Sequence, residues 1–156
     1  MYGLVNRAIE QLVVSSKGDA AWQRVCAGAG IGAEGFVAMC PYDDSLTFTL
    51  VQAVSEELAM PPAQVLEAFG EYWILYTADE GYGELMASAG PDMRSFLANL
   101  DDMHGRVEAV LPQMKLPRFS VEDLADGALR VHYRSEREGL APIVVGLLRG
   151  LAGRFG

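Results

Sequence analysis

Two groups of side chains in this sequence have the types and the spacing that ligand binding requires. His104 lies within residues 96–111, FLANLDDMHGRVEAVL, where apolar residues recur at helical spacing and the imidazole falls inside the apolar stripe. Tyr133, Ser135 and Arg137 occupy alternate positions of LRVHYRSER and therefore share one face of a predicted strand. An imidazole directed into a core needs a hydrogen-bond partner or a metal, because burying it unpaired is costly. Two hydroxyls and a guanidinium suit one or two carboxylates of a bound molecule.

The helix that carries His104 is predicted to have two distinct faces. Its apolar stripe comprises Phe96, Leu97, Leu100, Met103, Val107, Val110 and Leu111. We expect the opposite face to be polar and to carry Asn99, Asp101, Asp102, Arg106 and Glu108. The ordinary structural alternatives are a core histidine with a satisfied hydrogen bond and a strand whose polar end is solvated.

Hydrophobic periodicity predicts the elements that must position these residues. Helices are expected over residues 2–14, 20–27, 45–58 and 63–77, followed by a turn at 79–83. Pro91 and Asp92 open the helix of His104, and a last helix covers residues 141–154 with Pro142 near its first turn. The strand at 129–135 needs a partner, which we expect near Phe119. The fold class is therefore α+β, a mainly helical body with a small antiparallel sheet near the C-terminus.

Composition narrows the possible functions. The 156 residues are 51% hydrophobic, which indicates one globular domain over residues 1–156 and no membrane span. The formal charge of −9 argues against nucleic acid, and the first residues lack the pattern of a signal peptide, so we expect a cytoplasmic protein. Cys26 and Cys40 are predicted to be buried free thiols. Two histidines almost exclude a conventional site of two or three imidazoles, but one can still bind a metal that brings its own ligands, as haem iron does.

No pattern in the sequence favours catalysis. Residues 30–35 match GxGxxG, but a helix precedes them where a nucleotide-binding loop needs a strand, so we interpret them as a loop. Three pairs of adjacent carboxylates diverge in helices and are expected in solvent: Asp43-Asp44, Glu56-Glu57 and Asp101-Asp102. Acid–base chemistry has little support without a second histidine beside a nucleophile, and we predict that the protein is not an enzyme.

Taken together, His104 and the YxSxR pattern at Tyr133, Ser135 and Arg137 resemble the haem nitric oxide/oxygen-binding (H-NOX) family, which includes the haem domain of the soluble guanylate cyclase β subunit. The resemblance covers nearly the whole chain, through MYGLVNRAI, YDDSLTFTLVQAVSEEL, FGEYW, EGYGEL, LDDMHGRV and YRSEREGLAPIVVGLLRGL. It implies haem b as the cofactor, buried between the helical body and the sheet. Family members continue past the last helix into further strands, so the resemblance also implies a C-terminally truncated chain.

The resemblance assigns a role to each candidate residue. His104 would be the iron ligand, and the haem propionates would be bound by Tyr133, Ser135 and Arg137. Pro117 would press on the porphyrin, and the distal wall would include Val5, Ile9, Trp73 and Ile143. Oxygen-binding members place a tyrosine at the position of Ile143, so isoleucine implies a haem that binds NO and CO and excludes O₂, unless the indole N–H of Trp73 points at the ligand.

The implied function is a gas sensor whose output is a change of shape. Weakening of the bond between iron and His104 would let its helix and the sheet shift. In stand-alone bacterial members of the family, the protein partner is a histidine kinase or a diguanylate cyclase. The alternative is a carrier or binding module for another carboxylate-bearing apolar ligand, or for a different tetrapyrrole, with His104 as a hydrogen-bonded core residue.

Overall fold

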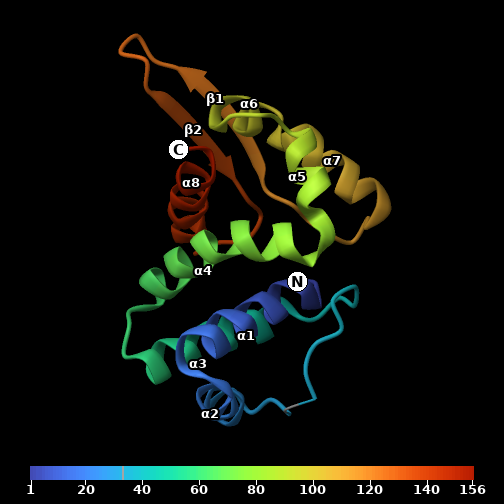
Figure 1. Ribbon diagram of the computed structural model, residues 1–156. Coiled ribbons are helices and arrows are strands. Elements are labelled where there is room, and N and C mark those ends of the chain that lie inside the picture. Colours follow the sequence, from blue (N-terminus) through green and yellow to red (C-terminus); the bar gives the residue numbers. More distant parts are fainter. Residues whose placement is uncertain (33) are drawn as a thin grey trace.

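The computed structural model describes residues 1–32 and 34–156, which form eight α-helices and a β-hairpin around two apolar cores. One group of helices comprises α1 (Gly3–Lys17), α2 (Asp19–Ala29) and α3 (Asp44–Leu58), and α4 (Pro62–Thr77) crosses between this group and the rest of the chain (Figure 1). The remainder comprises η1 (Ala78–Tyr82), α5 (Gly83–Ser88), α6 (Met93–Ala98), α7 (Leu100–Val110), β1 (Arg118–Asp123), β2 (Leu129–Arg134) and α8 (Ala141–Phe155). The predicted α+β class, with a small antiparallel sheet near the C-terminus, is confirmed.

Local signals account for the ends of the first four helices. The Asp43 carboxylate accepts a hydrogen bond from the Ser45 N–H at 2.8 Å and caps α3. Pro62 stands in the first turn of α4, where its missing N–H costs nothing. Gly18 separates α1 from α2 with a φ of +82°, a conformation that favours glycine. The four predicted helices are confirmed, with ends that differ by up to three residues.

The helix predicted around His104 is divided in two. Asn99 has a φ of −98° and a ψ of 3°, which interrupts the helix between α6 and α7. Its side-chain amide donates to the Ala89 carbonyl at 2.8 Å, a contact made at the break. Phe96 is buried as predicted, but Val110 at the end of α7 is 79% exposed, so the predicted apolar stripe is wrong at that position. Such a break follows from a tertiary contact of Asn99 that periodicity does not reveal.

The strands β1 and β2 form an antiparallel pair in which Val121 faces Val131 and Phe119 faces Tyr133. The partner strand predicted near Phe119 is therefore confirmed. Side chains alternate between a face that packs on the second core and an exposed face, as the pleat requires. The strand β2 ends at Arg134, so Ser135 follows the strand and does not belong to it.

Helices α4 and α8 approach closely because glycines lie at their contact. A Cβ atom on Gly146 would lie 1.9 Å from the Glu67 carbonyl oxygen, and one on Gly70 would lie 2.1 Å from the Ile143 carbonyl oxygen. Both obstacles are backbone atoms of the facing helix. The close contact therefore depends on glycine in each helix.

The loop between α2 and α3 differs from the sequence-based prediction in one respect. Cys26 is buried, as predicted, but Cys40 is exposed, so the prediction of two buried thiols is wrong for Cys40. The backbone of Cys40 is what the fold uses, because its carbonyl accepts a hydrogen bond from the Gly3 N–H at 2.9 Å. Gly30 ends α2 in the left-handed conformation, as a loop at 30–35 would require, and Ala33 of that motif lies outside the described residues. No helix formed by the described residues is long and apolar enough to cross a membrane.

Candidate functional site

A cavity of about 280 Å³ lies between α4, α7, α8 and the segment that joins α7 to the hairpin. Its lining side chains are mostly apolar and include five of the chain's seven methionines, Met1, Met39, Met86, Met103 and Met114. Among the residues predicted for the site, those in the lining are Val5, Trp73, His104, Pro117, Tyr133, Ser135, Arg137 and Ile143. The fold thus gathers residues from both ends of the chain around one apolar space.

The described lining of this cavity does not include Ile9. Ile9 follows Val5 by one helical turn on the same face of α1, and its side chain is 3% exposed within the N-terminal core. One turn of helix advances the chain by about 5.4 Å, which carries Ile9 away from the cavity and toward α2 and α3.

His104 is held in one protonation state by its surroundings. Its Nδ1 lies 2.9 Å from the Pro117 carbonyl oxygen. Since a carbonyl oxygen only accepts, Nδ1 carries the proton and Nε2 keeps its lone pair. Burial lowers the pKa of His104, although the hydrogen bond to Pro117 and the nearby carboxylates Asp101 and Glu108 oppose this shift. The imidazole is therefore neutral near pH 7, with one nitrogen available as a ligand.

Two residues that were predicted on the polar face opposite His104 lie beside its imidazole instead. Asp101 and Glu108 lie three residues before and four residues after His104, which places them beside it on α7. The carboxylate of Asp101 accepts from the Phe119 N–H, and that of Glu108 accepts from the Leu116 N–H. Their spacing from His104 was a usable signal, but hydropathy alone assigns every carboxylate to solvent.

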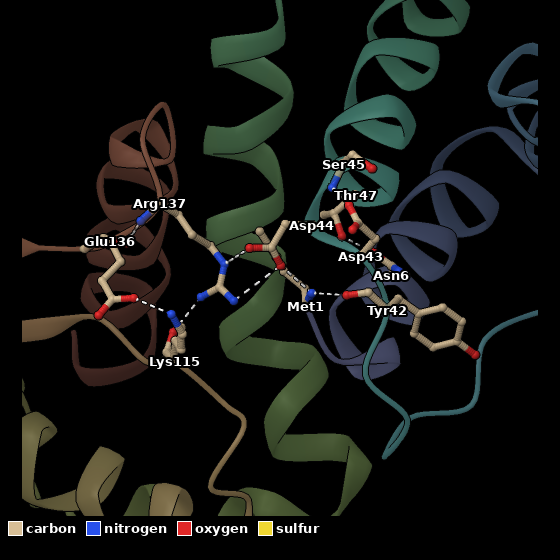
Figure 2. Close-up of polar contacts among 11 residues, drawn as sticks. Met1, Asn6, Tyr42, Asp43, Asp44, Ser45, Thr47, Lys115, Glu136 and Arg137 are labelled. Carbon is tan, nitrogen blue, oxygen red and sulfur yellow. Dashed lines mark hydrogen bonds and ion pairs between the residues drawn. The ribbon is translucent and has the colours of Figure 1, made fainter.

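The Arg137 guanidinium already donates three hydrogen bonds to other parts of the chain (Figure 2). Its Nε donates to Asp44 at 2.7 Å, one terminal nitrogen donates to the same carboxylate at 3.3 Å, and the other donates to the Lys115 carbonyl at 2.6 Å. A guanidinium has five N–H groups, so two remain for a carboxylate of a bound molecule. Nearby, the Ser135 hydroxyl accepts a hydrogen bond from the backbone N–H of Arg137 at 3.0 Å.

Asp44 is a site residue that the sequence did not reveal. It was expected in solvent, but its half-exposed carboxylate contacts both Arg137 and the N-terminal ammonium of Met1, the latter at 2.5 Å (Figure 2). The hydrogen bond from Arg137 is the largest cause that lowers the pKa of Asp44, so this carboxylate is ionised near pH 7. Asp44 and Arg137 are 93 positions apart, and no local pattern connects them.

A non-helical turn shapes the wall that α4 and α5 contribute. Within η1, Glu80 and Gly81 leave helical geometry, and Gly81 has a φ of +92°. The lining residues Trp73, Thr77, Tyr82 and Met86 therefore follow one another at spacings of four, five and four residues. Tyr82 is a lining residue that the sequence did not single out.

The donor set of the cavity determines what kind of molecule it suits. Across residues 1–32 and 34–156, no group of three or more His, Cys, Asp or Glu side chains could hold a metal ion. A metal bound by His104 must therefore bring its other ligands with it. A tetrapyrrole does so, and its carboxylate arms match the unused donors of Arg137 and the hydroxyls of Tyr133 and Ser135. Flexible methionine side chains allow an apolar wall to adapt to such a molecule.

Residues 2–156 match the Haem-NO-binding family, HNOB. The chain belongs to this family, the H-NOX domains. It is 34% identical over 159 residues to the soluble guanylate cyclase gcy-35 of Caenorhabditis elegans, a match that covers 99% of the chain and 23% of that protein. It is 35% identical over 158 residues to gcy-32 of the same organism, again over 99% of the chain and 23% of the relative. The chain thus spans about a quarter of the length of these cyclases.

Solved H-NOX structures have the same fold. An H-NOX protein from S. oneidensis in the Fe(II)NO ligation state has a TM-score of 0.87 and 26% identity, over 99% of this chain and 85% of that one. A mutant in the Fe(II) ligation state has a TM-score of 0.90 and 25% identity, over 100% of this chain and 83% of the other. An oxygen-binding H-NOX domain in its oxygen complex, 18% identical with a TM-score of 0.83 over 99% of this chain and 81% of that one, shares the fold alone.

Membership of the H-NOX family implies a haem cofactor and the binding of a gas, but leaves the choice of gas open. In this H-NOX chain, Ile143 of α8 lines the cavity together with Trp73 and Phe69 of α4, whose ring centroids are 5.7 Å apart. Isoleucine has no hydrogen-bond donor. The Thr77 hydroxyl, also in the lining, donates to the Trp73 carbonyl at 2.7 Å.

Proposed function

We propose that this H-NOX chain, as a single sensor domain over residues 1–156, binds haem b through His104 and senses NO and CO in preference to O₂. The observation that carries the proposal is one apolar cavity that contains both an imidazole with a bare Nε2 and a guanidinium with two unused N–H donors. Haem bound in this cavity would supply a ferrous iron that can bind a diatomic gas. The residues of the chain determine how the haem is held and which gas is favoured.

The proposed grip on haem uses two parts of the cavity lining. His104 binds the iron through Nε2, while Pro117 accepts its Nδ1–H and presents its ring to the cavity. Arg137, Ser135 and Tyr133 bind the propionates. Arg137 can do so without releasing Asp44, because two of its five N–H groups are unused.

The proposed preference for NO and CO rests on the distal wall, for which we propose Val5, Trp73 and Ile143, without Ile9, which lies outside the described cavity lining. Bound O₂ is strongly polarised, and a hydrogen bond to it stabilises the complex by about 1–3 kcal/mol, which is about tenfold or more in affinity. Ile143 provides no donor, and the Thr77 hydroxyl is already bonded to the Trp73 carbonyl. NO and CO depend far less on such a bond. Other residues of the cavity lining that carry a side-chain donor include Trp73, Tyr82 and Tyr2.

The proposed signal is mechanical. Release of His104 would free α7 to move relative to the distal helices, while Arg137 stays tied to Asp44 at the start of α3. The two arrangements would present different surfaces to a partner protein, for which a histidine kinase or a diguanylate cyclase is our proposal. In this scheme the domain turns over no substrate and acts in the cytoplasm.

An absorption spectrum tests the proposal, with the second histidine as a matched control. His132 lies on the exposed face of β2 with a side chain that is 48% exposed, so His132→Ala should keep the haem Soret band. His104→Ala should lose the band and regain it when imidazole is added. The ferrous protein should give NO and CO complexes and no stable oxy spectrum in air. A stable oxy spectrum would contradict the gas preference, and a colourless protein that cannot be reconstituted with haem would favour the carrier alternative.

A further inference from the structure

Three side chains on one face of α7 hold the backbone of residues 116–119. Asp101 accepts from the Phe119 N–H at 2.5 Å, His104 donates from Nδ1 to the Pro117 carbonyl at 2.9 Å, and Glu108 accepts from the Leu116 N–H at 3.1 Å. The helix and the segment run in opposite directions, so the contacts follow one another in order like rungs. We call this set of three contacts the α7 ladder.

The α7 ladder also fixes the ring that packs beside His104. Asp101 holds the backbone of Phe119, and the ring of Phe119 packs edge-on against the His104 imidazole, with centroids 5.8 Å apart. The centroid of the Phe119 ring also lies 5.5 Å from that of Tyr133, one of the proposed propionate-binding residues. The position of residues 116–119 therefore influences both parts of the proposed haem grip.

Glu108 holds the end of this segment that is farther from the hairpin. Its first carboxylate oxygen binds the Leu116 N–H, and its second binds the Arg118 guanidinium at 2.8 Å. Pro117, between them, has no N–H and cannot anchor itself by donating a backbone hydrogen bond. The carbonyl that His104 needs thus lies between two backbone N–H groups that α7 holds, Leu116 by Glu108 and Phe119 by Asp101, while Arg118 is held only through its exposed side chain.

A shift of that carbonyl would change the chemistry of His104. Without an acceptor at Nδ1, a neutral imidazole can move its proton to Nε2, and a protonated Nε2 cannot bind a metal. A weaker Nδ1 hydrogen bond also makes Nε2 a poorer donor to a metal, and partners of this kind typically change metal affinity by about 10–100-fold.

We propose that Glu108 is a positioning residue of the site. By accepting from the Leu116 N–H, it keeps the Pro117 carbonyl on Nδ1 of His104 and so maintains the tautomer whose Nε2 is free to bind. The consequence for haem rests on the function proposed above, whereas the consequence for the tautomer does not. Reach, and not charge, is the property of Glu108 that matters.

Two conservative variants separate reach from charge. Glu108→Asp keeps the charge but is one methylene too short for the Leu116 N–H. Glu108→Gln keeps the reach and one acceptor oxygen for the Leu116 N–H, but it loses the charge and, because an amide NH₂ cannot accept a hydrogen bond, the contact with Arg118. Asp102→Asn is the matched control, because it removes the same charge from an exposed carboxylate on the same helix. All three are small changes at a helix surface, and a cooperative thermal unfolding transition is the check that each variant is folded.

The first measurement is the tautomer of His104 in the full chain without added haem, from long-range ¹H–¹⁵N correlation spectra. Wild type, Glu108→Gln and Asp102→Asn should show a protonated Nδ1 and an unprotonated Nε2. Glu108→Asp should raise the Nε2-protonated form at least about tenfold relative to wild type. An unchanged tautomer in Glu108→Asp, or an equal change in Glu108→Gln, overturns the proposal.

The second measurement uses the haem-loaded chain. Glu108→Asp should weaken haem binding by about tenfold, the lower end of the usual range for a residue that acts through a ligand. Its iron–histidine stretching frequency should fall relative to wild type, while Glu108→Gln and Asp102→Asn stay close to wild type. If neither the wild type nor any variant binds haem, the proposed function fails. The tautomer measurement still tests the role of Glu108 in that case.

Discussion

Replacing Gly146 by alanine should destabilise the fold through the contact between α4 and α8. The new Cβ would lie 1.9 Å from the Glu67 carbonyl oxygen and 2.8 Å from the Glu71 nitrogen, so the helices must separate by about 1.5 Å to restore an ordinary contact distance. Overpacking of this kind costs about 1–3 kcal/mol, and backbone atoms cannot turn aside as a side chain does, so we take the upper end. The better helix propensity of alanine returns up to about 1 kcal/mol.

The net loss in the free energy of unfolding is therefore about 2 kcal/mol, which lowers the melting temperature by roughly 4–8 °C in a domain of this size. Gly153 provides the control, because a Cβ there meets nothing within 4 Å and the residue lies in the same helix. Gly153→Ala should stabilise the protein slightly. Urea and thermal unfolding of both variants measure the difference. If Gly146→Ala proves as stable as Gly153→Ala, the close approach of α4 and α8 is not as described.

Three further outcomes are expected. A thiol reagent such as Ellman's should label Cys40 rapidly in the folded chain and Cys26 only in denaturant, because burial both covers Cys26 and raises its pKa; two fast thiols would contradict this. Asp44→Asn should destabilise the fold by at most about 1 kcal/mol, since the ion pair with Arg137 is partly exposed, and the loss should shrink in high salt. Because the pKa of Asp44 is lowered in the folded state, its contribution is present above the ordinary Asp pKa and disappears as pH falls through the folded value, so the acid limb of stability should flatten in Asp44→Asn. The pKa of His104 is lowered by burial, so stability should fall as pH drops below about 6.5, and His104→Gln should remove that part of the pH dependence.

Periodicity and capping residues predict most of the elements because both act within a few positions of the chain. The α3 helix follows from the cap at Asp43, and the alternation of residues 129–135 indicates β2. The break at Asn99 was not predictable in this way, because its cause is a hydrogen bond to a carbonyl ten positions earlier. Exposure of Cys40 was missed for a related reason, since the fold uses the backbone of that residue and leaves its side chain free.

The candidate site was predicted in its residues but not in its supports. His104 and Arg137 stand out by type and spacing, and both line the cavity. Asp44 and Glu108 look like ordinary surface carboxylates, since a single charged residue carries no sign of the partner it will meet. Their roles depend on contacts that exist only after the helices, the hairpin and the chain terminus have come together.

The turn η1 also limits how this part of the chain can change in length. The spacing of five residues between Thr77 and Tyr82 keeps Tyr82 and Met86 on the cavity side after α4 has ended. Deleting one residue from the turn would rotate α5 about its axis by about 100°, the rotation that one residue of an α-helix contributes. Both side chains would then leave the cavity wall. We therefore expect deletions and insertions among relatives to avoid residues 78–82, even where the amino acids of the turn are free to vary.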